Sequence, residues 1–421
     1  MVVEAFSILL LLSITIILGY IGLIVFERTK IPDIIWLMIL GLILGPVLQI
    51  FPTELFIGIS SLMAALALII LLYDAGLNMD FYQMIKGVPR GTLMSLVNLS
   101  LSMAAIGAFS MFVFGFDSMQ GLLLGAIVGG TSSPIVITIM RGLNVRPNVQ
   151  TLLQLESILT DPFTIVIALA LLEVIRSGAP ISSTVGNILS AFSIAIVVGS
   201  IVGIVWLSVL DKLKGRPFDY MLTLALLFIL YVFTESVKGS GALAVLAFGI
   251  VLGNSKVFSR MFRLGKIFTV DALLKKFHTE ISFFIRSFFF VYMGLIVAIN
   301  PQYVLYGLAI TVILLFLRAV GVRIATLKMA LTPLEANIAK IMGPRGLAAA
   351  VLAQLPLVFG LPGAEIYSNI AFVVILGTVV YTSIMTGLIS KRAPVTEAPP
   401  AEEAAAEKPK KPRKKRRSRK R

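Results

Sequence analysis

The sequence contains no cysteine and only one histidine, His278, among its 421 residues. The absence of cysteine excludes disulfide bonds, thiolate metal sites and thiol redox chemistry. A single histidine also excludes a metal site built from several imidazoles. The motifs contain no Ser/His pair and no catalytic pair of aspartates, so we expect neither an enzyme nor a bound cofactor.

Charged residues are also scarce, at 14% of the chain, whereas 58% of the residues are hydrophobic. Soluble domains have about 25% charged and about 45–50% apolar residues. Apolar runs of about 20 residues, the length that a helix needs to cross a bilayer, recur from end to end. The predicted fold class is therefore an all-α polytopic membrane protein of the cell membrane.

Thirteen transmembrane spans are predicted from these runs. Their ranges are 3–26, 31–50, 54–77, 88–116, 118–140, 148–177, 182–210, 219–237, 240–254, 278–298, 302–328, 334–359 and 364–390.

Lysine and arginine gather in alternate loops, and this asymmetry orients a membrane protein with its basic loops in the cytoplasm. The basic side of this chain carries Arg28, Lys30, Lys86, Arg90, Arg141, Arg146, Lys212, Lys214, Arg216, the loop at 256–276, Arg323, Lys328, Lys391 and Arg392. The other side has Arg176 and Lys238. We expect the N-terminus outside and the C-terminus in the cytoplasm.

The tail at 393–421 holds eleven Lys or Arg and four Glu. Such a composition cannot bury apolar surface, so a disordered cytoplasmic tail is predicted. Its charge suits anionic lipid headgroups. No aromatic residues interleave with the basic ones, so specific nucleic-acid binding is not expected.

Two parts of the chain resemble each other at an offset of seven spans. The run 72–77 (Leu-Tyr-Asp-Ala-Gly-Leu) in span three is echoed by 291–295 (Val-Tyr-Met-Gly-Leu) in span ten. Span five is broken by 129–134 (Gly-Gly-Thr-Ser-Ser-Pro), and span twelve by 343–346 (Gly-Pro-Arg-Gly). An odd offset inverts one half relative to the other, and paired interrupted helices mark the binding site of many transporters. We therefore predict inverted repeats with two crossed, discontinuous helices.

The run 156–162 (Glu-Ser-Ile-Leu-Thr-Asp-Pro) places Asp161 near the middle of span six. Intramembrane acids are costly and are functional by default. Ser157 lies one turn earlier on the same helix face, and Pro162 deprives the Ile158 carbonyl of its helical partner. These oxygen groups suit a small cation, although Asp161 as a buried acid with only a packing role is the alternative.

Glu156 is five residues from Asp161 and points about 140° away on a helix. Three arginines lie inside later spans and need partners: Arg286, Arg318 and Arg345. We pair Glu156 with Arg318, for which snorkelling to the cytoplasmic surface is the alternative. Arg345 would hold the broken end of span twelve, and Arg286 would compete with a bound cation for Asp161.

Span five is expected to face Asp161. Its glycines and Pro134 interrupt the helix, and Thr131 and Ser132 are suitable caps for the helix that restarts there. Irregular backbone at this depth lines a cavity or is buried in protein. A simple kink without ligands is the alternative. Tyr73, Asp74 and Glu235 lie near span ends, where an interfacial role is expected.

These motifs are similar to those of the cation/proton antiporters, the sodium–proton exchanger superfamily. The run 156–162 resembles that family's Glu-Ser-x-x-Asn-Asp-Pro signature. Arg318 in Leu-Arg-Ala-Val-Gly-Val and Arg345 in Gly-Pro-Arg-Gly-Leu resemble its two arginine motifs. The broken span five and the Tyr-Asp-Ala-Gly-Leu run of span three also match, so the resemblance covers about residues 1–390.

The resemblance implies a homodimer of thirteen-helix chains, each with a scaffold and a mobile core. We expect the core within about 54–177 and, in part, 278–359, and the antiporter domain over 1–392. It implies that Asp161 carries the cation or the proton, with Ser157 and Thr131 as co-ligands of a monovalent cation. It also implies the Glu156–Arg318 pair.

Three positions bear on the subgroup. Thr160 stands where family members usually have Asn or Asp, and Ser132 stands where many have Asp, so the site is less acidic than most. Arg286 resembles a basic residue of other, often electrogenic, branches.

The sequence thus predicts a secondary antiporter that exchanges Na⁺ or K⁺ for H⁺ and contributes to pH homeostasis. With one free carboxylate we expect electroneutral one-for-one exchange. A sodium-coupled organic-anion symporter of the same fold is the alternative, and a channel fits a lone proton-binding carboxylate less well.

Overall fold

The computed structural model describes residues 2–29, 31–51, 60–79, 81, 89–141, 143, 145–178, 181–213, 216, 218–263, 266–327 and 329–392. Over these ranges the chain is helical and contains no strand. The basic tail at 393–421, the first part of the third predicted span, at 54–59, and Lys30, Lys86, Lys214 and Lys328 of the basic loops lie outside the described residues.

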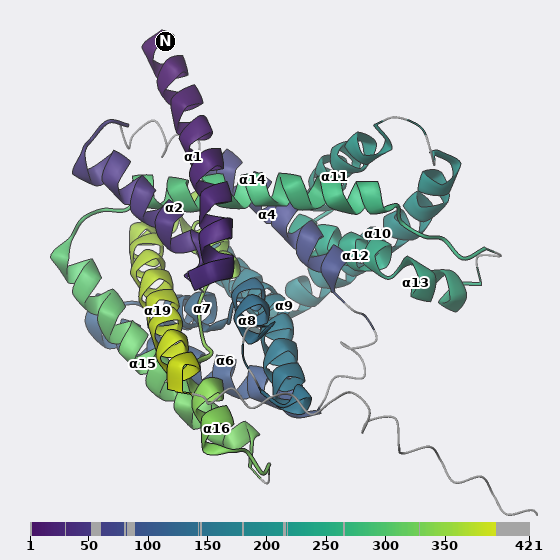
Figure 1. Ribbon diagram of the computed structural model, residues 1–421. Helices are drawn as coiled ribbons and strands as arrows, with labels where there is room; N and C mark the ends of the chain where they lie inside the picture. Colours follow the sequence, from purple (N-terminus) through teal and green to yellow (C-terminus); the bar gives the residue numbers. More distant parts are fainter. Residues whose placement is uncertain are drawn as a thin grey trace, which may run out of the picture.

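The elements follow one another in the order shown in Figure 1. They are α1 (Val2–Thr29), α2 (Asp33–Leu42), the π-helix η1 (Ile43–Val47), α4 (Ser60–Asn78), α6 (Pro89–Phe114), α7 (Ser118–Gly129), α8 (Ser133–Arg141), α9 (Pro147–Ser177), α10 (Ile181–Leu213), α11 (Asp219–Ser236), α12 (Gly241–Gly253), α13 (Ser255–Met261), α14 (Ala272–Ile296), α15 (Pro301–Ala325), α16 (Pro333–Ile341), α17 (Leu347–Leu352), α18 (Leu355–Val358) and α19 (Ala364–Arg392).

These helices account for the thirteen predicted spans. In the described part of the chain, eight helices are long and apolar enough to cross a bilayer, and the bent pair α12–α13 makes a ninth. Four shorter apolar segments take the places of spans two, three, eight and twelve: Asp33–Val47, Leu62–Asn78, Tyr220–Ser236 and Leu347–Val358. The all-α polytopic fold is confirmed.

The two predicted interruptions are also present. Span five is divided into α7 and α8, and span twelve into α16, α17 and α18. Both broken spans begin with the same device, a capping box in which two side chains satisfy backbone N–H groups that a helix start leaves free. Asp117 and Gln120 form it at the start of α7, and Thr332 and Glu335 at the start of α16.

Close crossings of helices repeat at the same seven-span offset. Helix α4 crosses α12 where Gly76 faces Gly249, and a Cβ atom on Gly249 would lie 2.6 Å from the carbonyl oxygen of Tyr73. Helix α14 crosses α2 where Gly294 faces Gly41, and a Cβ atom on Gly41 would lie 2.0 Å from the carbonyl oxygen of Val291. Helices α2, α4, α12 and α14 form spans two, three, nine and ten. A shift of seven spans relates span two to span nine and span three to span ten, so the two crossings are equivalent under the repeat. The internal repeat is thus visible in the packing.

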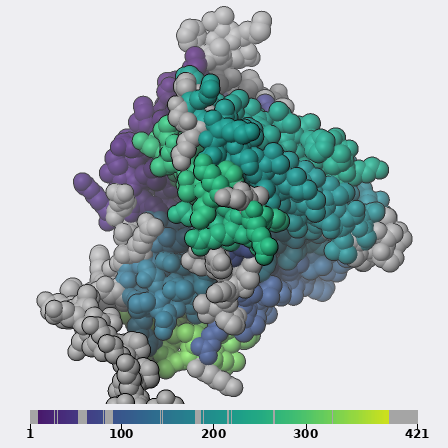
Figure 2. All heavy atoms as spheres, turned by 90° about the vertical axis from the view of Figure 1, so that its right-hand side faces the viewer, coloured from purple at the N-terminus to yellow at the C-terminus, as the bar shows by residue number. Residues whose placement is uncertain are grey.

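The helices pack as two groups (Figures 1 and 2). One group contains α1, α2, α4, α10, α11, α12 and α14, and lies in the upper part of Figure 1. The other contains α6, α7, α8, α9, α15, α16, α17 and α19 and lies below it. The core predicted within 54–177 and 278–359 included α4 and α14, which pack mainly with the first group. Which group moves stays a prediction.

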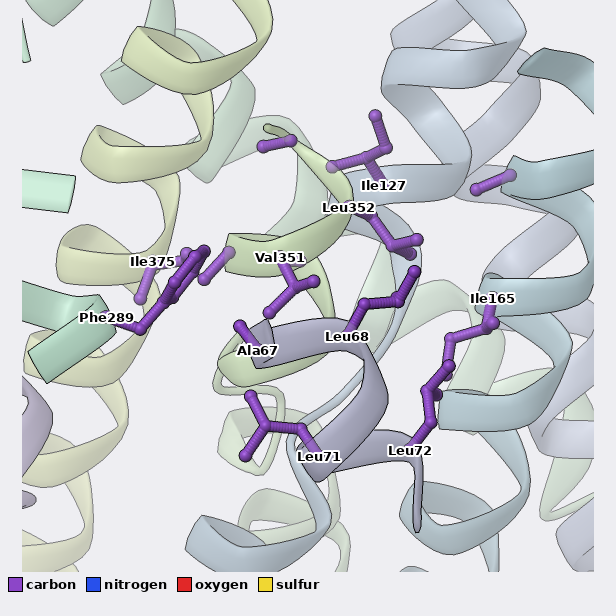
Figure 3. Close-up of a cluster of buried hydrophobic side chains, with 14 of the residues drawn as sticks. Ala67, Leu68, Leu71, Leu72, Ile127, Ile165, Phe289, Val351, Leu352 and Ile375 are labelled. Atoms are coloured by element: carbon purple, nitrogen blue, oxygen red, sulfur yellow. The ribbon is translucent and has the colours of Figure 1, made fainter. Parts of the chain in front are cut away.

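An apolar cluster joins the two groups at the centre of the molecule (Figure 3). Ala67 and Leu68 of α4 face Val351 and Leu352 of α17. Leu72 of α4 meets Ile165 of α9, and Ile127 of α7 lies beside Leu352. Apolar side chains between the groups make few directional contacts. Burial of apolar side chains therefore dominates the contact between the groups at this place.

The glycine crossings yield a stability prediction. Replacing Gly249 or Gly294 by alanine pushes a Cβ atom into backbone of the facing helix, at 2.6 Å and 2.4 Å. Overpacking of this kind costs about 1–3 kcal/mol, so we expect a lower thermal unfolding temperature in detergent. Gly387→Ala is the control because no atom lies within 4 Å of its Cβ position. An unchanged unfolding temperature in both crossing variants would show that the crossings are loose.

Candidate functional site

The two broken spans meet backbone to backbone. The Ser132 N–H, between α7 and α8, donates a hydrogen bond of 2.8 Å to the carbonyl of Pro344, between α16 and α17. Gly346 lies so close that a Cβ atom there would be 2.5 Å from the Ser132 Oγ. A side chain at position 346 would therefore separate the two breaks.

Helix α19 satisfies the rest of the break in span twelve. The Thr378 hydroxyl accepts a hydrogen bond of 3.0 Å from the Arg345 N–H, and the Thr382 hydroxyl donates one of 3.0 Å to the Ile341 carbonyl. Backbone groups buried without partners are costly. These hydroxyls allow span twelve to stay unwound in the interior.

Asp161 lies on α9 and faces the start of α8. Its carboxylate accepts a hydrogen bond from the Ser133 hydroxyl. The carboxylate is half-buried and lines a cavity of about 230 Å³ bounded by α4, α8, α9 and α17. The charge that the sequence places at mid-span thus faces a space large enough for a small hydrated ion.

A second carboxylate lines the same cavity. Asp74, which the sequence suggests is interfacial, lies on its wall near the end of α4. The Asn78 side-chain amide donates to its Oδ1 at 3.0 Å and to its carbonyl at 2.9 Å. The sequence assigns Asp74 only an interfacial role, whereas the structure shows that it also lines the cavity, because α4 ends against it. Tyr73, in contrast, is fully buried, beside His278.

Glu156 lies on another face of α9 and contacts Arg318 of α15. The Arg318 Nη1 donates to the Glu156 Oε1 at 2.8 Å, and both side chains are buried. The Arg318 Nε also donates to the Ala339 carbonyl at 3.1 Å. The five-residue separation of the two acids has therefore placed one in the cavity and the other in an ion pair between helices.

The two expected hydroxyl ligands, Ser157 and Thr131, bond to other groups than Asp161 and are absent from the cavity lining. The Ser157 hydroxyl donates to the Gln154 carbonyl at 3.0 Å. The Thr131 hydroxyl lies 3.3 Å from the Glu156 Oε1 and 3.4 Å from the Thr160 hydroxyl. The Thr160 hydroxyl in turn donates to the Glu156 carbonyl.

Ser133 is a site residue that the sequence analysis does not single out. A signal was present, because Ser133 lies between Ser132 and Pro134, where the interrupted helix starts again.

The remaining two arginines occupy different surroundings. Arg345 is buried in the break of span twelve, and its Nε and Nη1 have no hydrogen-bond partner among the residues that the structure describes. Arg286 lies against Asp33 of α2, with 3.3 Å between Nη2 and Oδ2. The pairing of Arg286 with Asp161 that the sequence suggests is therefore corrected to Asp33, an acid that the sequence reasoning did not consider.

The donor set of the site consists of oxygen atoms. The described residues contain no cluster of three or more His, Cys, Asp or Glu side chains able to hold a metal ion. Two carboxylates and several hydroxyls can bind a proton or a monovalent cation, which need only one negative charge. The cavity lining contains no Lys or Arg, so an anion would be disfavoured there.

Comparisons with known proteins agree with this geometry. The family model of the sodium/hydrogen exchanger, transmembrane, matches residues 12–392. The probable Na(+)/H(+) antiporter 2 of Methanocaldococcus jannaschii is 29% identical over 370 residues, covering 82% of this chain and 85% of that protein. The K(+)/H(+) antiporter NhaP of Alkalimonas amylolytica is 23% identical over 333 residues, covering 77% of this chain. This match spans only 56% of the length of that relative.

A solved structure has the same fold. The sodium proton antiporter MjNhaP1 from Methanocaldococcus jannaschii, determined at pH 8, superposes with a TM-score of 0.75 at 22% identity and covers 92% of this chain and 99% of its own. The family model spans nearly all of the described helices. The chain belongs to the sodium/hydrogen exchanger family of transmembrane proteins.

Proposed function

We propose that this protein is a secondary antiporter of the plasma membrane that exchanges a monovalent cation, Na⁺ or K⁺, for H⁺ and so contributes to pH homeostasis. The observation that carries the proposal is Asp161, a half-buried carboxylate at the crossing of two broken helices that faces a cavity of about 230 Å³. A carboxylate there binds either a proton or a cation but not both at once, and this exclusivity couples the two flows.

Asp161 is the site that the proton and the cation share, and its hydrogen bond with Ser133 must break when a cation binds. A cation that reaches the carboxylate displaces the Ser133 hydroxyl and takes up oxygen ligands in its place. Ser157, one turn before Asp161, and Thr131, at the break in span five, are the co-ligands that we propose. Ser132, Thr160 and Arg345 support the crossing, and Glu156 with Arg318 holds α9 against α15.

The two helix groups provide a route for alternating access. The group with α7, α8, α9 and α17 carries Asp161, and it meets the other group across the apolar surface of α4. We propose that the first of these rocks against the second, which forms the scaffold of a homodimer. Its outer helices α1 and α10 expose large apolar side chains such as Leu10, Tyr20 and Ile201, suited to lipid or to a second copy.

We place the N-terminus outside and the C-terminus in the cytoplasm, because the basic loops lie on one side of the spans. The basic tail then lies beside anionic headgroups of the inner leaflet. In this orientation the cavity, which reaches Asn78 and Met79 at the end of α4, faces the cytoplasm.

Asp161→Asn is expected to abolish exchange, because an amide neither binds a proton nor neutralises a cation. The assay is proton flux in proteoliposomes driven in turn by Na⁺, K⁺ and Li⁺. Asp211→Asn is the control, since Asp211 lies at the end of α10 and pairs with Lys266. Exchange by the Asp161→Asn protein at more than about a tenth of the wild-type rate would contradict the assignment.

Glu156→Ala is expected to lower stability more than it lowers ion affinity. The change leaves Arg318 buried and unpaired, which costs about 3–5 kcal/mol. Thermal unfolding in detergent measures the loss, and the double variant Glu156→Ala/Arg318→Met should recover most of it. A single variant as stable as the wild type would show that the ion pair contributes nothing.

Exchange is expected to be electroneutral, one cation for one proton, because Thr160 stands beside Asp161 where a second carboxylate would be, so that α9 brings a single carboxylate to the cavity. An imposed membrane potential in sealed proteoliposomes should leave the rate of exchange unchanged. A rate that follows the potential would assign transported charge to a second group, with Asp74 the first to test.

A further inference from the structure

Thr164 is a buried hydroxyl near the site with no assigned role. It lies on α9 one turn beyond Asp161, and its side chain is fully buried. Within the described part of the chain its Oγ1 has no hydrogen-bond partner. A threonine in a helix can usually donate to a carbonyl of the preceding turn, so this unsatisfied group calls for an explanation.

The Thr164 hydroxyl faces the end of α7. A Cβ atom on Gly130 would lie 2.7 Å from the Thr164 Oγ1, so this position has no room for a side chain beside the hydroxyl. Gly130 is the C-cap residue that follows α7. Because α7 ends there and Gly130 is extended, the last carbonyls of α7 have no partner within the helix.

Asp161 and Thr164 therefore face the two helix ends that meet at the break in span five. Asp161 contacts Ser133, at the N-terminal end of α8, whose partial positive charge favours a carboxylate. Thr164 contacts Gly130, at the C-terminal end of α7, whose partial negative charge favours a cation. The cavity is lined by Asp161, Ser133 and Ile165 but not by Thr164, which lies behind its wall.

We propose that the Thr164 hydroxyl and the end of α7 at Gly130 form a second oxygen site for the transported, partly dehydrated monovalent cation, on the side of Asp161 opposite the cavity. The inference rests on the proposed antiport function. The site carries no full charge, so it holds the cation only together with Asp161. It acts when Asp161 is open to the side opposite the cavity, which is the outside in the proposed orientation.

The test compares Thr164→Val, which replaces the hydroxyl by a methyl group of similar size, with Thr164→Ser, which keeps the hydroxyl. The control is Thr234→Val, because Thr234 is equally buried but donates to the Leu230 carbonyl at 2.7 Å in α11, which belongs to the other helix group. The KM for Na⁺ and K⁺ is measured from each side, in right-side-out and everted membrane vesicles. Thermal unfolding in detergent is measured in parallel.

Thr164→Val should raise the KM on the side opposite the cavity at least fivefold, change the KM on the cavity side less than twofold, and unfold no earlier than wild type. Thr164→Ser and Thr234→Val should keep both KM values. Equal KM changes on both sides, no change on either, or a Thr164→Val protein that fails to fold would overturn the inference. Absence of exchange in the wild type would instead overturn the proposed function.

Discussion

Every backbone N–H and carbonyl in the hydrocarbon region must find a partner within the protein, and two helices broken at that depth satisfy this constraint by crossing each other. The hydrogen bond from the Ser132 N–H to the Pro344 carbonyl joins the breaks directly. Hydroxyls of α19 pair with groups of Arg345 and Ile341. The unwound backbone is thus stable in the interior.

The cost of burying an unpaired charge also explains why the two acids of α9 have different roles. Glu156 is fully buried, so its charge is tolerable only with a partner at contact distance, and Arg318 supplies it at 2.8 Å. Asp161 is half-buried and faces a cavity, so it can exchange its partners with water. A helix of 3.6 residues per turn separates positions five apart by about 140°, which places the acids in different environments.

Much of this arrangement could be predicted from the sequence, because it follows from local rules. Apolar run lengths predict the thirteen spans, and glycine and proline at 129–134 and 343–346 predict the two breaks. The Glu156–Arg318 pair follows because three intramembrane arginines need partners and few acids lie at a similar depth. The close crossings of Gly76 with Gly249 and of Gly294 with Gly41 bear out the internal repeat that the sequence suggested.

Contacts that depend on how whole helices are rotated and placed could not be predicted. Asp74 faces the cavity because α4 ends there, and no local pattern distinguishes this from an interfacial position. Arg286 pairs with Asp33 across 253 residues of sequence, and Ser133 rather than Thr131 meets Asp161 because the restarted α8 turns its first residue toward α9. Such choices depend on packing between elements.

The central claim is that one carboxylate binds either a proton or a cation. Proton release on Na⁺ or K⁺ binding tests it directly, with the purified protein titrated in weakly buffered detergent while pH and heat are recorded. The account predicts about one proton released per cation bound, and neither binding nor release in the Asp161→Asn protein. Cation binding without proton release, or release that persists in that variant, would contradict it.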